Sequence, residues 1–259
     1  MEARYDNLSI LSRWMKDILL AVIFLTRLPV KLKEGTESPK LAEVIWAFPV
    51  VGVVVGAFAS LVMLIGFQLG LDPLVCGLIA VAAQALITGA LHEDGLADVA
   101  DGFGGGNKVV DKLRIMRDSC VGTYGVLALV FSVTFRAGLI ANMTTQTIAV
   151  LALISAGAVS RALVALAMNQ LEIVRTDGLA TGAGKPTNEA TLVTLALGAA
   201  IAFLLLGASG WIVLVVTFGA AVMIGLFAKR QIGGQTGDVL GTVQQVTEAT
   251  VLLSMVSVM

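Results

Sequence analysis

Long apolar stretches alternate with short polar connections along most of the chain. Each stretch is about 17 residues or longer, the length that an α-helix needs to cross the hydrocarbon core of a bilayer. An earlier and shorter stretch, Ile18–Leu25, is followed by Arg27 and Pro29, so we expect an interfacial or re-entrant helix there. The sequence predicts seven spans, at Val44–Leu69, Leu74–Leu91, Gly122–Ile140, Ile148–Met168, Ala190–Leu206, Trp211–Ala228 and Val239–Val258.

Composition supports this interpretation. Hydrophobic residues make up 57% of the chain, charged residues 14%, and the mean hydropathy is +0.92. Soluble domains carry about 25% charged residues. We therefore expect an all-α, polytopic transmembrane helical bundle that forms one domain over residues 1–259. The net charge of −1 gives no reason to expect a nucleic-acid partner.

Positive charge alternates between the connections. Lys and Arg occur in connections 31–43, 92–121, 169–189 and 229–238 and are missing from 70–73, 141–147 and 207–210. Basic connections of membrane proteins stay on the cytoplasmic side. We therefore expect the N-terminus inside and the C-terminus outside, in a bacterial or archaeal cytoplasmic membrane whose lipids surround the chain.

An acidic cluster, HEDGLADVADG at residues 92–102, follows the second predicted span. Asp94, Asp98 and Asp101 stand at i, i+4 and i+7, which puts three carboxylates on one face of a helix. Such carboxylates repel one another unless a cation lies between them, and oxygen ligands of this kind suit Mg²⁺ or Mn²⁺. The cluster therefore predicts a metal site on the cytoplasmic side, and a solvated helix end is the alternative.

Two further patterns place cations and polar groups near this cluster. DKLRIMRDSCVGTYG, residues 111–125, predicts an amphipathic helix and a glycine-flanked loop whose cations could pair with phosphates or with anionic lipids. Arg136 and Arg161 lie inside apolar stretches, where a charge costs about 2.5–3.5 kcal/mol, so each should face the bundle or a cavity. Arg161 is the better candidate for a substrate phosphate, with structural pairing as the alternative.

The last predicted span carries a polar stripe. Gly241, Gln245 and Glu248 continue the helical face of Asp238. Because polar side chains in a span avoid lipid, the stripe is expected to line a cavity.

Taken together, these segments resemble the cobalamin synthase family, the adenosylcobinamide-GDP ribazoletransferases. The resemblance covers nearly the whole chain, and the spacing of DGLAD and GTYG is its most specific part. The segments that carry it are FLTRLPV at 24–30, FPVVGVVVG at 48–56, LHEDGLADVADGFGGG at 91–106, KLRIMRDSCVGTYG at 112–125, SRA at 160–162 and GGQTGDVLG at 233–241.

The resemblance implies a phosphoryl transfer at the membrane. A hydroxyl of α-ribazole, or of its 5′-phosphate, would attack the cobinamide-linked phosphorus of adenosylcobinamide-GDP, and GMP would leave. Metal held by Asp94, Asp98 and Asp101 would bridge the diphosphate, and Asp101 or Asp238 would accept the hydroxyl proton. A homo-oligomer stays an open alternative. Substrate contacts are expected at Gly104, Gly105, Arg117, Asp118, Ser119, Thr123, Tyr124 and Arg161.

Two other functions stay open at this stage. A CDP-alcohol phosphotransferase acting on lipid would share the chemistry, but Asp98 stands where the motif of that family has an arginine. A transporter would place its binding groups near the membrane midplane, often within internal repeats, whereas these acids gather at one membrane face and no repeat is visible.

Overall fold

The computed structural model describes residues 10–31, 40–175 and 182–258. Within these ranges the chain is helical, and the one β-type pairing is an isolated bridge between Ile173 and Gln235. The prediction of an all-α fold is therefore confirmed. The helices are α1 (Ile10–Leu25), α2 (Phe48–Gln68), α3 (Pro73–Thr88), α4 (Leu91–Gly105), α5 (Val109–Ile115), α6 (Thr123–Ala141), α7 (Gln146–Gln170), α9 (Asn188–Leu206), α10 (Gly210–Ile232) and α11 (Gly237–Val258).

The helical runs that qualify as candidate spans are fewer than the seven spans that the sequence predicts, and the count of seven stays a prediction. In the described part of the chain, five helical runs are long and apolar enough to cross a membrane, or six if the bent pair α3–α4 counts as one span. The run Asn188–Ile232 counts once although it contains both α9 and α10, which meet at Gly207 with a φ of +57°. The predicted span Leu74–Leu91 also ends early, at Thr88.

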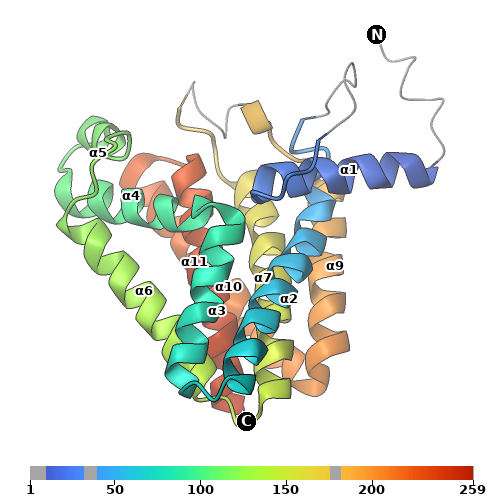
Figure 1. Cartoon of the computed structure of the whole chain (residues 1–259). Helices are drawn as coiled ribbons and strands as arrows, with labels where there is room; N and C mark the ends of the chain where they lie inside the picture. Colours follow the sequence, from blue (N-terminus) through green and yellow to red (C-terminus); the bar gives the residue numbers. More distant parts are fainter. Residues whose placement is uncertain (1–9, 32–39, 176–181, 259) are drawn as a thin grey trace.

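A sharp elbow explains this early end. Gly89 and Ala90 both adopt left-handed backbone conformations, with φ values of +65° and +57°. A left-handed residue ends a helix, and two in succession turn the chain by 96° from α3 into α4. The acidic cluster therefore lies on a separate helix that runs across the end of the bundle (Figure 1).

Helices α1 and α4 lie across one end of the bundle, the short helix α5 lies at the same end, and the longer helices run along the bundle (Figure 1). Helix α1 runs crosswise at the same end as α4 and is not among the candidate spans, as predicted for the stretch Ile18–Leu25. The same end also carries α5 and the start of α11, so the basic connections of the described chain gather there. The C-terminal end of α11 lies at the opposite end.

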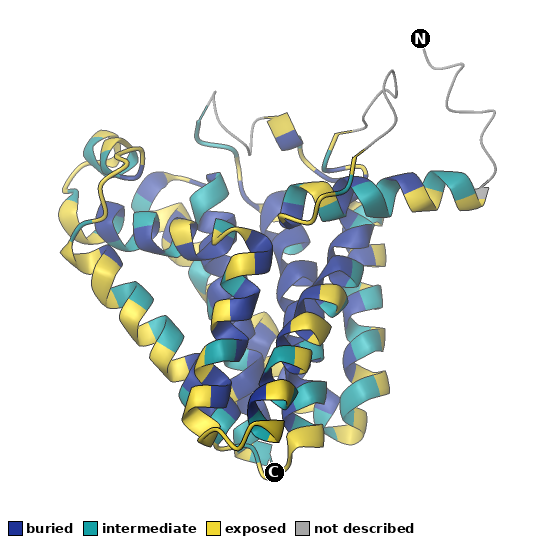
Figure 2. Cartoon of the chain, viewed as in Figure 1, coloured by how far each residue is buried: buried dark blue, intermediate teal, exposed yellow. Residues whose placement is uncertain are grey.

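Helix α7 forms the centre of the bundle and is buried along most of its length (Figure 2). It packs on α2 through glycines, because a Cβ at Gly52 would lie only 2.1 Å from the Gly157 carbonyl oxygen. Such small residues let helices approach closely in a membrane. The outer faces expose large apolar side chains such as Phe131, Leu204 and Val215, as expected for surfaces in contact with lipid.

Candidate active site

The site is built where α4 crosses α11 at backbone contact. A Cβ at Gly95 would lie 2.8 Å from the carbonyl oxygen of Asp238, and one at Gly241 would lie 3.2 Å from that of His92. The Thr242 hydroxyl also donates a hydrogen bond to the Gly95 carbonyl, at 3.2 Å. This crossing brings the carboxylates of α4 to the first turn of α11, where Asp238 lies.

Asp98 lies in a strongly negative environment. Helix α4 has four acidic residues among fifteen and turns by 96° from α3 to run across the end of the bundle (Figure 1). Burial of the side chain and the charges of Asp238 and Asp94 raise the pKa of Asp98 to about 7. Asp94 itself is exposed. Carboxylates crowded in this way attract a cation.

Asp101 faces a different partner. Its carboxylate accepts hydrogen bonds from the backbone N–H groups of Gly122, at 2.7 Å, and Gly125, at 2.9 Å, and the residue is only 8% exposed. It therefore caps the N-terminus of α6. A Cβ at either glycine would lie within 2.5 Å of an Asp101 oxygen, so both glycines leave room for this carboxylate. The assignment of Asp101 as a metal ligand stays a prediction.

Asp238 is held by a residue that sequence reasoning used only for topology. Arg175 lies 3.2 Å from Asp238 through Nη1 and donates from Nη2 to the Leu113 carbonyl, at 3.1 Å. The Thr236 hydroxyl donates to the same Asp238 oxygen, at 3.1 Å. No motif in the sequence distinguishes Arg175, because it follows α7 in an irregular segment.

The segment GGQTG, residues 233–237, positions Asp238, because its hydrogen bonds join the start of α11 to the segment that follows α7. Gln235 N–H donates to the Glu172 carbonyl at 2.8 Å, and Val174 N–H donates to the Gln235 carbonyl at 3.1 Å. The Gln235 side-chain amide donates to two further carbonyls at the end of α7. The polar composition of this segment therefore serves structure as well as the site.

A cavity of about 220 Å³ opens beside these residues, at the end of the bundle where the basic connections gather. Two carboxylates, two guanidinium groups and one imidazole share its wall with apolar side chains. Its lining includes His92, Asp94, Arg161, Arg175, Thr236, Asp238, Phe24, Leu25, Leu41, Phe48, Leu91, Val164, Met168 and Leu240. The cavity combines groups that bind anions with groups that bind cations.

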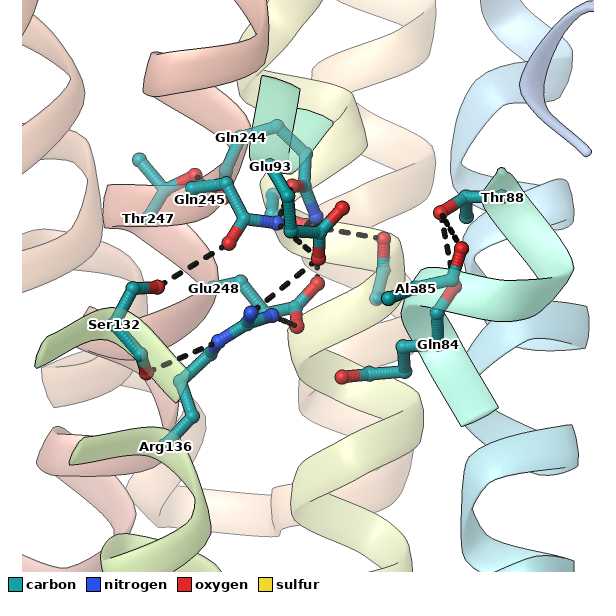
Figure 3. A network of polar contacts seen from close by, with 12 residues as sticks. Gln84, Ala85, Thr88, Glu93, Ser132, Arg136, Gln244, Gln245, Thr247 and Glu248 are labelled. Carbon is teal, nitrogen blue, oxygen red and sulfur yellow. Dashed lines mark hydrogen bonds and ion pairs between the residues drawn. The ribbon is translucent and has the colours of Figure 1, made fainter. Parts of the chain in front are cut away.

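Arg161 lines this wall and belongs to a buried network of charges, of which Figure 3 shows the part around Arg136 and Glu248. It is 1% exposed, donates to the Gly157 carbonyl at 3.1 Å and lies 3.9 Å from Glu248. Arg136 lies between Glu248, at 2.9 Å, and Glu93, at 3.3 Å. Two guanidinium groups thus balance two carboxylates, which is how a bundle interior tolerates charge.

This network corrects the expectation that the polar stripe of α11 lines a cavity. Gln245 donates to Glu93 at 3.1 Å, and Gln244 donates to Glu248 at 2.6 Å (Figure 3). Both glutamines are buried. The stripe beyond Gly241 therefore pairs with polar side chains of α4, α6 and α7, namely Glu93, Ser132, Arg136 and Ser160.

The remaining predicted substrate contacts lie outside this cavity, on the far part of α4 and the turn before α6. The Tyr124 ring lies over Gly104, where a Cβ would come within 2.7 Å of it. Asp118 accepts a hydrogen bond from the Cys120 N–H at 3.1 Å. Their roles in binding stay predictions. Exposed positions in this group are Gly104, Gly105, Arg117, Asp118, Ser119, Thr123 and Tyr124.

The donors for a metal ion are dispersed in this structure. Among the described residues, no group of three or more His, Cys, Asp or Glu side chains is arranged closely enough to hold a metal by itself. Burial, and after it the charges of Asp238 and Asp94, raise the pKa of Asp98, so these neighbouring carboxylates disfavour its ionised form. Their oxygen chemistry fits Mg²⁺, which usually keeps waters or substrate oxygens in its shell.

Comparison with known proteins identifies the family. A family model described as cobalamin-5-phosphate synthase matches residues 17–256. The chain belongs to this family. It is 42% identical over 238 residues to the adenosylcobinamide-GDP ribazoletransferase of Bradyrhizobium diazoefficiens, with 92% of each chain covered. It is also 42% identical to the enzyme of that name from Mesorhizobium japonicum, again over 92% of each chain, and no solved structure matches it.

Proposed function

We propose that this chain catalyses the adenosylcobinamide-GDP ribazoletransferase reaction, a late step of vitamin B12 biosynthesis. Its family and the names of its relatives support the proposal. The observation that carries it is the cavity in which the carboxylates of Asp94 and Asp238 face the guanidinium groups of Arg161 and Arg175. This pairing suits a reaction in which a diphosphate is bound and a proton is removed.

In this reaction one bond to phosphorus replaces another. A hydroxyl oxygen of α-ribazole, or of its 5′-phosphate, bonds to the cobinamide-linked phosphorus, the bond to the GMP oxygen breaks, and GMP leaves. Arg161 and Arg175 would orient the diphosphate oxygens and offset their charge. Asp238 lines the cavity whereas Asp101 faces α6, so we assign acceptance of the hydroxyl proton to Asp238.

We further propose that Asp94 and Asp98 hold Mg²⁺ when substrate is present, with Mn²⁺ as a substitute. When bound, the cation would neutralise charge on the diphosphate and on the departing GMP. The crowded carboxylates support this assignment, and the substrate oxygens would supply the ligands that the protein lacks.

The size of the cavity indicates how a corrinoid would bind. A volume of about 220 Å³ is smaller than the pockets of about 300–1,000 Å³ that enclose drug-sized ligands. Only the diphosphate and the attacking ribose would therefore enter, while the corrinoid stays at the mouth. The basic connections gather at this end, which supports a site that faces the cytoplasm.

The test uses purified protein in detergent with adenosylcobinamide-GDP, α-ribazole 5′-phosphate and Mg²⁺. GMP and corrinoid product should form in equal amounts, and a chelator should stop both. Asp94→Asn should lower turnover at least 100-fold in a protein that stays folded. If GMP forms as fast with the chelator, the metal assignment is wrong. If no corrinoid product forms but a CDP-linked head group is transferred to lipid, the proposed function is wrong.

A further inference from the structure

A second cavity is also lined by Asp94. It has a volume of about 430 Å³ and is formed by the end of α1, the chain that follows it, and the elbow between α3 and α4. It shares Phe24, Leu91 and Asp94 with the main cavity. A group bound here would therefore face the same carboxylate as a group bound beside Arg161 and Arg175.

Arg27 is the cation of this second cavity. Of the described residues that line it, Arg27 alone is cationic, and the guanidinium group makes no hydrogen bond or ion pair with any residue that the structure describes. Arg27 is also exposed. An exposed guanidinium group in a polar cavity can bind an anion in a bidentate manner.

The elbow holds Arg27 in place. Its backbone N–H donates to the Ile87 carbonyl at 2.7 Å, and its side chain crosses Gly89, where a Cβ would lie 2.2 Å from the Arg27 Nε. The next residue, Ala90, keeps a left-handed conformation that costs a residue with a side chain about 1–2 kcal/mol. Backbone strain of this kind often marks a functional position.

From this placement we propose that Arg27 binds a phosphate group of one substrate, in a subsite that shares Asp94 with the Arg161–Arg175 cavity. The inference rests on the proposed function. Two sources of phosphate are present in that reaction, the 5′-phosphate of the α-ribazole acceptor and the diphosphate of the donor. A phosphate beside Asp94 would otherwise be repelled, and Arg27 supplies the opposite charge.

The experiment compares KM values for wild type, Arg27→Gln and Arg27→Lys. Each protein is assayed with α-ribazole 5′-phosphate, with α-ribazole, and with varied adenosylcobinamide-GDP. Lys31→Gln serves as the matched control, because Lys31 is an exposed cation that lies outside both cavities. Loss of a charge-assisted hydrogen bond should raise the KM of the phosphate-bearing substrate about 10- to 100-fold.

The two sources give different results. If Arg27 binds the acceptor, Arg27→Gln raises the KM for α-ribazole 5′-phosphate and leaves that for α-ribazole unchanged. If it binds the donor, the donor KM rises with either acceptor. Arg27→Lys should raise the same KM by a smaller factor, and it provides the test if Arg27→Gln does not fold.

The proposal is overturned if every KM stays within twofold of wild type, or if Lys31→Gln has the same effect as Arg27→Gln. Failure of the proposed function is a separate result, because wild type would then form no corrinoid product with either acceptor.

Discussion

Asp98 and Asp101 are the same residue type three positions apart on α4, and their surroundings give them opposite properties. Asp98 is half-buried beside two other carboxylates, whereas Asp101 accepts two backbone hydrogen bonds at the start of α6. Ionisation of Asp98 therefore destabilises the folded protein, whereas the hydrogen bonds of Asp101 stabilise it. Their spacing in the sequence does not reveal this difference.

We predict that Asp98→Asn stabilises the metal-free protein above neutral pH. The folded-state pKa of Asp98 is raised from 3.8 to about 7, so wild type loses stability as pH rises from about 4 to about 7, and asparagine removes that loss. After screening by solvent, the gain at pH 8 should be about 1 kcal/mol, or about 2–4 °C in Tm. Thermal unfolding at pH 5 and pH 8 would measure it.

Asp101→Asn is the contrast for this experiment. It weakens the cap of α6, so it should lower Tm at both pH values rather than raise it at the higher one. An Asp98→Asn variant that is less stable than wild type at pH 8 would contradict the electrostatic account of this site.

The buried charges give a second prediction at the scale of residues. Arg136→Met would leave Glu93 and Glu248 buried without their closest cation, which costs about 3–5 kcal/mol. We expect Tm to fall by roughly 10 °C. Adding Glu248→Gln to this variant should recover part of the loss, because one unpaired charge is then removed. If Arg136→Met alone were as stable as wild type, the network would not stabilise the fold.

At the scale of elements, the site depends on how closely two helices cross. The contact between Gly95 on α4 and the backbone of Asp238 on α11 leaves no room for a Cβ. The elbow at Gly89 and Ala90 sets the direction in which α4 leaves α3. Together they decide which carboxylates meet at the cavity.

We predict that Gly95→Ala separates α4 from α11 and displaces Asp98 from Asp238. Overpacking of this kind costs about 1–3 kcal/mol, and a shift of about 1 Å in a catalytic group can cost about 100-fold in rate. Turnover and Tm of the purified variant would measure both effects. Gly138→Ala on α6 is the matched control, because a Cβ there meets nothing within 4 Å. Equal activity in the two variants would contradict the role given to this crossing.

At the scale of the whole molecule, the connections sort to two ends. Helices α1, α4 and α5 lie at the end that also carries both cavities, and α11 ends at the other (Figure 1). Exposed apolar side chains cover the helices between these ends (Figure 2). The bundle therefore presents its chemistry at one face of the membrane.

The native cysteines provide a test of which face this is. Cys120 is exposed in the connection between α5 and α6, Cys76 is buried, and α5 lies at the same end of the molecule as α4 (Figure 1). We predict that an impermeant maleimide does not label Cys120 in intact cells and does label it in inverted vesicles. A Cys120→Ser, Ala208→Cys protein, with its cysteine between α9 and α10, should show the reverse pattern. Labelling of native Cys120 from outside would reverse the orientation proposed for the site.

The sequence by itself determined the fold class of the protein and most of the residues of its site. Apolar length and the alternation of basic connections predict a helical membrane bundle, since both follow from the cost of placing polar groups in lipid. The spacing of Asp94 and Asp98 places them on one face of a helix, because residues four apart in the sequence lie one turn above each other. GTYG, one of the two motifs that carry the resemblance most specifically, contacts α4 three residues beyond DGLAD, where Asp101 accepts hydrogen bonds from the N–H groups of Gly122 and Gly125.

The tertiary structure alone decided which of these residues lie together in the site. Two left-handed residues bend the chain between α3 and α4, where the sequence predicts a span that continues to Leu91. Hydropathy cannot detect this bend, because it sums composition and ignores backbone direction. The pairing of Arg175 with Asp238, and the opening of two cavities at Asp94, join segments from different parts of the chain. Such contacts depend on how helices cross and pack, and a local pattern of residues carries no information about that geometry.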